Sequence, residues 1–205
     1  RSAKISADEA NLLKISTGNV NSVVGGDIKI AANSNLDVSE YLKKKNVAPN
    51  GEKIFSIAAA KDLHIEGDVT FANSNHTEDH ALALGAADHI EIVPGSTIKY
   101  EGSNLGMGSY SSLTLEDVDI DVGGNLAIGS LGDLNIKSTS PNSPSTFSVG
   151  RYSDTDNIYL YADNLMQIDG LGFNSNTREI YAEAITVNMK DVTFPSTSDV
   201  MLRSQ

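Results

Sequence analysis

The chain has 205 residues, which is enough for a single domain over 1–205 with a packed core. Its 27 acidic and 15 basic residues give a formal charge of -12, and this charge argues against nucleic acid as a partner because it repels phosphate backbones. Cysteine is absent, which excludes disulfides and thiolate metal sites, and no run of about 20 apolar residues is present, so we expect no membrane insertion.

A short pattern recurs along the chain: two apolar residues separated by one residue and followed, in most copies, by a small residue. The copies, in chain order, are Ile28 and Ile30, Phe55 and Ile57, Leu82 and Leu84, Leu105 and Met107, Leu126 and Ile128, Phe147 and Val149, and Leu171 and Phe173. Alternation with a period of two residues predicts β-strands, and the brevity of each run predicts that the strands are short.

A second apolar pair follows each copy after a short turn, and a third pair completes several units. The second pairs are Leu36 and Val38, Leu63 and Ile65, Ile90 and Ile92, Leu113 and Leu115, Leu134 and Ile136, Ile158 and Leu160, and Ile180 with Ala182. The third pairs include Val69 and Phe71, Ile98 and Tyr100, Ile120 and Val122, Leu165 with Ile168, and Ile185 with Val187. The unit containing Leu134 lacks a third pair, and we expect an irregular loop there.

Three short strands and three corners use about 24 residues, and stacked copies of this unit predict parallel sheets around a column of aliphatic side chains. Spacers such as Gly25-Gly26-Asp27 and Gly123-Gly124-Asn125 suit sharp corners. The predicted fold is therefore all-β, a right-handed parallel β-helix (β-solenoid) of about seven to eight coils, with the hand taken from the general preference of parallel crossovers. An antiparallel sandwich explains the turn spacing, but it does not explain why the strands repeat one another's sequence.

Three insertions interrupt the repeat, near residues 39–53, 73–79 and 138–146. Insertions in a solenoid emerge at its corners, so we expect any binding loops there. The first insertion contains the best helix candidate, Ser39–Lys45, with Ser39 as N-cap. Surface excursions without a function are the simpler interpretation, because insertions at exposed corners cost little free energy.

The segment His76–His80 reads His-Thr-Glu-Asp-His, and His89 follows it. Histidine and carboxylate side chains bind zinc, so His76 and His80 are candidate metal ligands. Two histidines four residues apart share a face only on a helix, however, and this segment lies between predicted strands. We therefore favour a solvated loop over a zinc site.

A second candidate is the acidic run of Glu116, Asp117, Asp119 and Asp121, which alternates in part with apolar residues. On a strand this run predicts a row of carboxylates along the outer face, and such a row could bind calcium. The EF-hand spacing and the glycine-rich calcium repeat are both missing, so a solvated acidic face is the simpler interpretation. We expect no cofactor, with calcium as the ion to test.

The copies Gly26-Asp-Ile-Lys-Ile30, Gly124-Asn-Leu-Ala-Ile128 and Gly132-Asp-Leu-Asn-Ile136 resemble the repeats of filamentous-haemagglutinin-like proteins and autotransporter passengers, and the resemblance covers most of residues 20–202. It implies a β-helix secreted or held at the cell surface of a Gram-negative bacterium, which acts as a stalk or adhesin without enzymatic activity. The family's secretion signature around Asn-Pro-Asn-Gly is absent, with Ala48-Pro-Asn-Gly51 as a partial echo, and this favours a segment of a longer protein.

We therefore expect a non-enzymatic structural or adhesive module, whose partners are glycans or a host or cell-surface protein and the neighbouring coils of a longer parent chain. A polysaccharide lyase or hydrolase is the alternative, because parallel β-helices also host such enzymes. Outward arginines are few, which argues against it. A carbohydrate-binding module is a further alternative; its tyrosines are Tyr100, Tyr110, Tyr152, Tyr159 and Tyr161, of which we expect Tyr159 to point outward from a strand.

Overall fold

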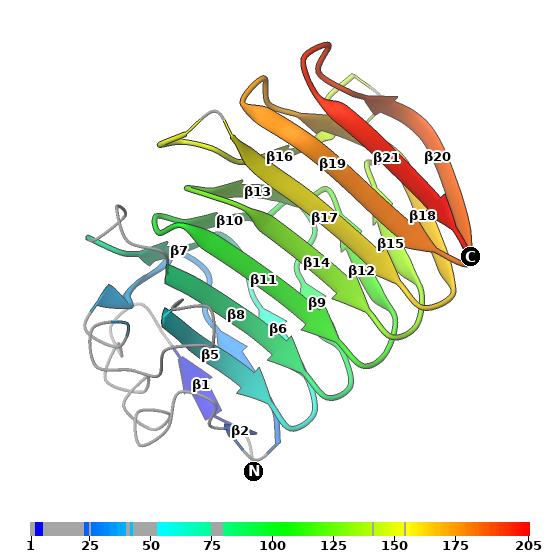
Figure 1. Ribbon diagram of the computed structural model, residues 1–205. Helices are drawn as coiled ribbons and strands as arrows, with labels where there is room; N and C mark the ends of the chain where they lie inside the picture. Colours follow the sequence, from blue (N-terminus) through cyan, green and yellow to red (C-terminus); the bar gives the residue numbers. More distant parts are fainter. Residues whose placement is uncertain are drawn as a thin grey trace.

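The computed structural model describes residues 3–5, 23–24, 26–39, 42, 53–74, 80–140, 142–153 and 155–205. These residues form a parallel β-solenoid of about six turns of roughly 23 residues, with almost no helix (Figure 1). The predicted all-β parallel β-solenoid is confirmed, while the predicted seven to eight coils are too many. No helix in the described ranges is long and apolar enough to cross a membrane.

The strands line three sides of the solenoid, and all strand pairs are parallel. The first side contains β1 (Ala3–Ile5), β3 (Ile28–Ile30), β6 (Leu63–Ile65), β9 (Ile90–Ile92), β12 (Leu113–Glu116) and β15 (Leu134–Lys137). The second side contains β4 (Ser34–Asp37), β7 (Val69–Ala72), β10 (Thr97–Tyr100), β13 (Asp119–Val122) and β16 (Ser145–Ser148). The third side contains β2 (Val23–Val24), β5 (Lys53–Ala59), β8 (His80–Ala86), β11 (Asn104–Ser109), β14 (Leu126–Ser130), β17 (Asp156–Ala162), β19 (Thr177–Ala184) and β21 (Asp199–Ser204). Two long strands, β18 (Leu165–Phe173) and β20 (Thr186–Thr193), run across both the first and the second side.

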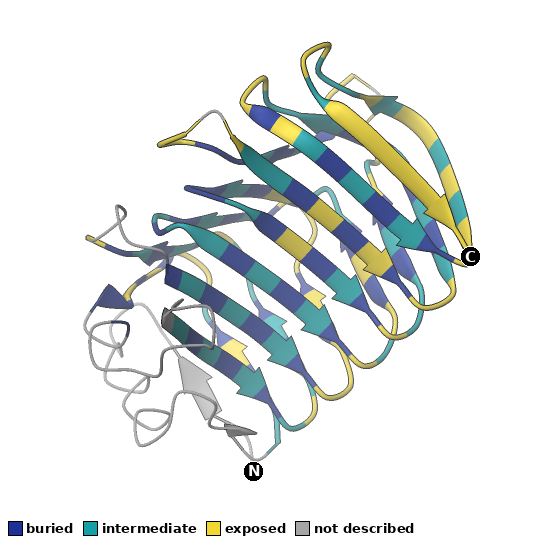
Figure 2. Cartoon of the chain, in the orientation of Figure 1, coloured by how far each residue is buried: buried dark blue, intermediate teal, exposed yellow. Residues whose placement is uncertain are grey.

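The core is a continuous column of mainly aliphatic side chains, which stack in register from coil to coil. Buried residues alternate with less buried ones along most strands (Figure 2). On the third side one such row consists of Ile57, Leu84, Met107, Ile128, Leu160 and Ala182, all of which are buried. Residues that alternate with the core positions of the first and third sides are exposed or half-buried, among them Lys29, His64, Glu91, Thr114, Asn135 and Tyr159.

The predicted alignment of the coils is right in the middle of the chain and wrong near its two ends. The repeat pattern matches Ile30 with Ile57 of the third side, but Ile30 pairs with Ile65 on the first side. Phe147 pairs with Ile120 on the second side, and Phe173 pairs with Phe147. The strand of Phe147 is therefore the third strand that the unit of Leu134 was predicted to lack. The predicted number of coils is too high because the copies of the repeat, each taken as the start of one coil, lie on three different sides of the solenoid.

The corner between the first and second sides uses left-handed backbone. Asp117, Gly170 and Asp191 occupy equivalent corner positions and have φ angles of 51°, 82° and 52°. Glycine and aspartate tolerate this conformation better than most residues. A Cβ atom at Gly170 would also lie 2.9 Å from the Cβ atom of Ser138, so this glycine is required by both backbone and space.

The three predicted insertions lie between strands, after β4, after β7 and after β15. Most of 39–53, including most of the predicted helix Ser39–Lys45, and residues 75–79 lie outside the described residues. Ser39 and Leu42 are helical, but Asp37 provides the capping acceptor, since its Oδ1 atom accepts the Ser39 N–H at 2.9 Å. In the third insertion the chain resumes a strand at Ser145, one residue before its predicted end.

Candidate functional site

Of the histidine segment the structure describes His80, and it also describes His89. His76 lies outside the described residues. His80 begins β8 and is only 1% exposed, with its Nδ1 atom 3.4 Å from Nδ2 of Asn73. His89 lies on the first side of the solenoid, where its backbone N–H donates to Asp62. His80 is therefore a buried corner residue beside a polar partner.

The acidic run on the second side contacts protein donors. Asp119 and Asp121 point outward from β13 as predicted, whereas Asp117 lies at the corner before it. The Asp117 carboxylate accepts hydrogen bonds from the hydroxyl of Thr139 at 2.5 Å and from its N–H at 2.7 Å, and these bonds lower the pKa of Asp117. The Asp117 carboxylate thus holds the start of the insertion after β15.

Two further contacts complete this arrangement. Asp119 Oδ1 accepts the N–H of Thr146 at 2.7 Å, and Asp121 Oδ2 lies 2.5 Å from Nη2 of Arg151. The acidic run therefore fastens the insertion after β15 and the loop after β16 to the second side. A calcium ion at these carboxylates would have to compete with hydrogen bonds and an ion pair that the protein already makes.

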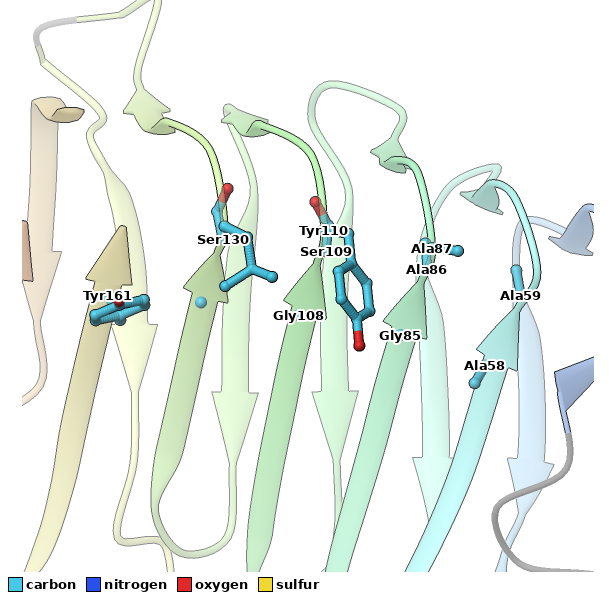
Figure 3. Close-up of a pocket in the computed structure, with 12 residues that line it drawn as sticks. Ala58, Ala59, Gly85, Ala86, Ala87, Gly108, Ser109, Tyr110, Ser130 and Tyr161 are labelled. Carbon is cyan, nitrogen blue, oxygen red and sulfur yellow. The ribbon is translucent and has the colours of Figure 1, made fainter. Parts of the chain in front are cut away.

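A shallow trough of about 420 Å³ lies on the third side of the solenoid (Figure 3). Its floor consists of small outward residues on neighbouring strands, among them Ala58 in β5, Gly85 in β8, Gly108 in β11 and Gly129 in β14. Because the strands are in register, these residues form one row across four coils. The row leaves a flat apolar surface.

Tyrosines stand at the borders of the trough. Tyr161 in β17 borders it on one side, and Tyr110, which follows β11 and is 71% exposed, stands over the sheet from the corner (Figure 3). The Tyr161 hydroxyl donates to Asp163, and this bond raises the pKa of Tyr161. In the next coil the Tyr181 hydroxyl donates to Glu183 and lowers the pKa of that carboxyl.

The outcome for the five candidate tyrosines is mixed. Tyr159 points outward from β17, as predicted, and Tyr161 does the same two residues later. Tyr110 and Tyr152 are exposed at corners. Tyr100 is fully buried, because it occupies an inward position of β10, and the prediction that includes it in a surface site is wrong.

The glycines of the trough floor are not demanded by packing. A Cβ atom at Gly85, Gly108 or Gly129 would meet nothing closer than 3.7 Å. None of the three has a positive φ angle. A glycine inside a strand costs about 0.5–1 kcal/mol relative to alanine. Their small size keeps the trough open at a cost in stability.

One cluster on the first side was not predicted from the sequence. Potential ligand atoms of Asp27, Asp62 and His64 all lie within 4.8 Å of one another. The signal was present in the sequence, because Asp27-Ile-Lys-Ile30 and Asp62-Leu-His-Ile65 are copies of one strand. Aligning Ile30 with Ile57 instead of Ile65 hid this relationship.

No family model matches this chain, and no curated protein or solved structure matches it. The resemblance to filamentous-haemagglutinin-like repeats therefore stays a prediction from the repeat sequences.

Proposed function

We propose that the chain is a non-enzymatic structural and adhesive module of a secreted or cell-surface protein from a Gram-negative bacterium. Its structural part is the solenoid. The third side joins eight strands by backbone hydrogen bonds from coil to coil, and each coil buries aliphatic side chains against the next. Such stacking couples every coil to its neighbours and makes a stiff rod.

The adhesive part is the tyrosine-bordered trough, and this single observation carries the proposal of ligand binding. We assign it to a neutral glycan. Tyrosine presents both an apolar ring face and a hydroxyl, which suits the apolar and hydroxyl faces of a sugar ring. The carboxylates of Asp163 and Glu183 beside Tyr161 and Tyr181 can accept hydrogen bonds from sugar hydroxyls. The same carboxylates and the formal charge of -12 disfavour anionic glycans.

The coil that contains β21 has an uncovered apolar face, which favours a neighbouring coil beside it. In β21, Val200 and Leu202 continue the inward row of Ile180 and Ala182, but they are 40% and 51% exposed (Figure 2). Among the described strands β21 pairs only with β19, so its other edge is open. A neighbouring parallel coil would cover both the apolar side chains and the open backbone groups.

The proposal is tested on a broad glycan array with the purified chain, with and without calcium, together with an activity screen on polysaccharides. We expect saturable binding to neutral glycans that Tyr161→Ala abolishes. Tyr152→Ala is the matched control, because Tyr152 is a similarly exposed tyrosine outside the trough. Bond cleavage would favour the polysaccharide-enzyme alternative, and silence in both assays would leave a structural spacer.

A further inference from the structure

Two columns of outward side chains run along the first side near its start. The strands β3, β6 and β9 pair in register, so Lys29, His64 and Glu91 are direct neighbours in one column. The same register places Asp27, Asp62 and His89, each two residues earlier in its coil, in the adjacent column. The two columns bring two histidines and three carboxylates onto one small area, although they come from three separate segments of the chain.

We propose that Asp27, Asp62 and His64 bind a zinc ion. Their ligand atoms lie within 4.8 Å of one another, and all three residues are half-buried. One imidazole nitrogen and two carboxylate oxygens are ligands that Zn²⁺ accepts, and a tetrahedral ion would retain one position for water. The imidazole disfavours calcium and magnesium, which prefer oxygen ligands.

The surroundings of the cluster orient the ligands as in a metal site. Nδ1 of His64 lies 2.8 Å from Oε2 of Glu91. A histidine that donates one ring N–H to a carboxylate keeps the lone pair of its other nitrogen for a metal. Asp62 is oriented in turn by His89, whose backbone N–H donates to its Oδ1 atom at 2.9 Å.

These contacts also keep Asp62 ionised. Burial on its own would raise the pKa of Asp62, but the hydrogen bonds from His89 outweigh it and hold the pKa below its ordinary value. Two positive charges near the cluster would repel a zinc ion. They belong to Lys29, which is exposed beside His64, and to Lys61, which is exposed at the corner before Asp62. Since both lysines are exposed, their side chains can extend into solvent.

The ion would join two coils, because Asp27 precedes β3 and Asp62 precedes β6. This role goes beyond the proposed module function, as it gives the first coils a metal cross-link. The experiment measures Zn²⁺ binding to the tag-free chain by calorimetry, with Co²⁺ as a spectroscopic probe. We expect binding at 1:1 stoichiometry and a rise in Tm of about 5–10 °C when Zn²⁺ is present at a hundred times its Kd.

The variants distinguish this site from others. His64→Ala and Asp62→Asn should each weaken Zn²⁺ binding at least tenfold, and Glu91→Gln about tenfold, because Glu91 acts only through His64. His76→Ala and Asp119→Asn are the matched controls and should bind as the parent does. Both His64 and Asp62 lie on the outer surface, so circular dichroism should show an intact fold.

Three results would overturn the proposal: no Zn²⁺ binding by the parent chain, equal binding by His64→Ala, or loss of binding in His76→Ala but not in His64→Ala. The last result would move the zinc site to the His76–His80 segment. Equal displacement of Zn²⁺ by the same concentration of Ca²⁺ would also contradict it, because it would identify a general site for cations among acidic residues. None of these results depends on whether the trough binds glycans.

Discussion

Asn125 donates two hydrogen bonds to the Oδ1 atom of Asn104 in the preceding coil, from its backbone N–H at 3.1 Å and from Nδ2 at 3.0 Å. Its own Oδ1 atom accepts the N–H of Asn157 in the following coil at 2.8 Å. Asn125→Ala should therefore lower the free energy of unfolding by about 1–3 kcal/mol, because it removes the side-chain acceptor of the Asn157 N–H and the Nδ2 bond to Asn104. Urea unfolding followed by circular dichroism measures the change.

Asn157→Ala is the matched control for this ladder of asparagine hydrogen bonds between coils. The Oδ1 atom of Asn157 is buried and has no hydrogen-bond partner among the described residues, and at this position the pairing of β17 with β19 shifts by one residue. Asn157→Ala removes only the Nδ2 bond to the Tyr159 hydroxyl at 3.0 Å, which is exposed. We expect a loss of under about 0.5 kcal/mol. A loss equal to that of Asn125→Ala would contradict the ladder as the source of stability.

Two glycines should respond to alanine in opposite directions. Gly108→Ala should raise the free energy of unfolding by about 0.5–1 kcal/mol, since its strand position has space and no positive φ angle. Gly170→Ala should lower it by more than that amount, because the φ angle is 82° and Ser138 occupies the space. Thermal or urea unfolding of the two variants in parallel tests the pair, and the same sign for both would refute this reading of the glycines.

Asp117 should make stability depend on pH. The bonds from Thr139 lower its pKa in the folded state, so its contribution is fully present above the unfolded pKa of about 3.9. The contribution is lost as the pH falls through the lower folded pKa. Thr139→Val should reduce the urea midpoint at pH 7, and the difference from the parent should vanish in acid. A difference that persists in acid would point to packing of Thr139 instead.

The open edge of β21 should promote association of the chain. Leu202 points toward the core side, and Met201 points to the opposite face of the same strand. We expect concentration-dependent association in sedimentation velocity, which Leu202→Glu abolishes because it places a charge where a coil would stack. Met201→Glu is the matched control and should still associate. A parent chain that stays monomeric at high concentration would contradict the prediction.

The sequence predicts the middle of the fold better than its ends. From Leu82 to Ile136 the coils have nearly constant length, so equivalent strands follow from spacing alone. The insertion after β15 breaks this spacing, and Phe147 with Val149 imitates the pattern of a third-side strand although Phe147 lies on the second side. Apolar alternation identifies a strand, but it does not distinguish the three sides of a solenoid.

Whether a site residue could be predicted depends on whether its position follows from one strand or from the pairing of two strands. Tyr159 was predictable as an outward residue because it alternates with Ile158 and Leu160 in one strand. The neighbourhood of Asp27 and Asp62 was not predictable from local spacing, since it exists only when β3 pairs with β6. Tyr100 cannot belong to a surface site, because it alternates with Ile98 as an inward residue of β10 and its hydroxyl lies 3.3 Å from Nδ2 of the buried Asn73.

Calorimetric titration of the chain with a neutral oligosaccharide selected on the array decides whether the trough binds glycans. Gly108→Val adds an apolar side chain to the floor of the trough, at a position where a Cβ atom would meet nothing closer than 3.9 Å, and Thr114→Val changes an exposed outward residue on the first side as the control. We predict that Gly108→Val abolishes binding while it retains the fold, and that Thr114→Val binds as the parent does. Unchanged binding by a folded Gly108→Val would contradict the account, because the ligand would then lie elsewhere on the solenoid.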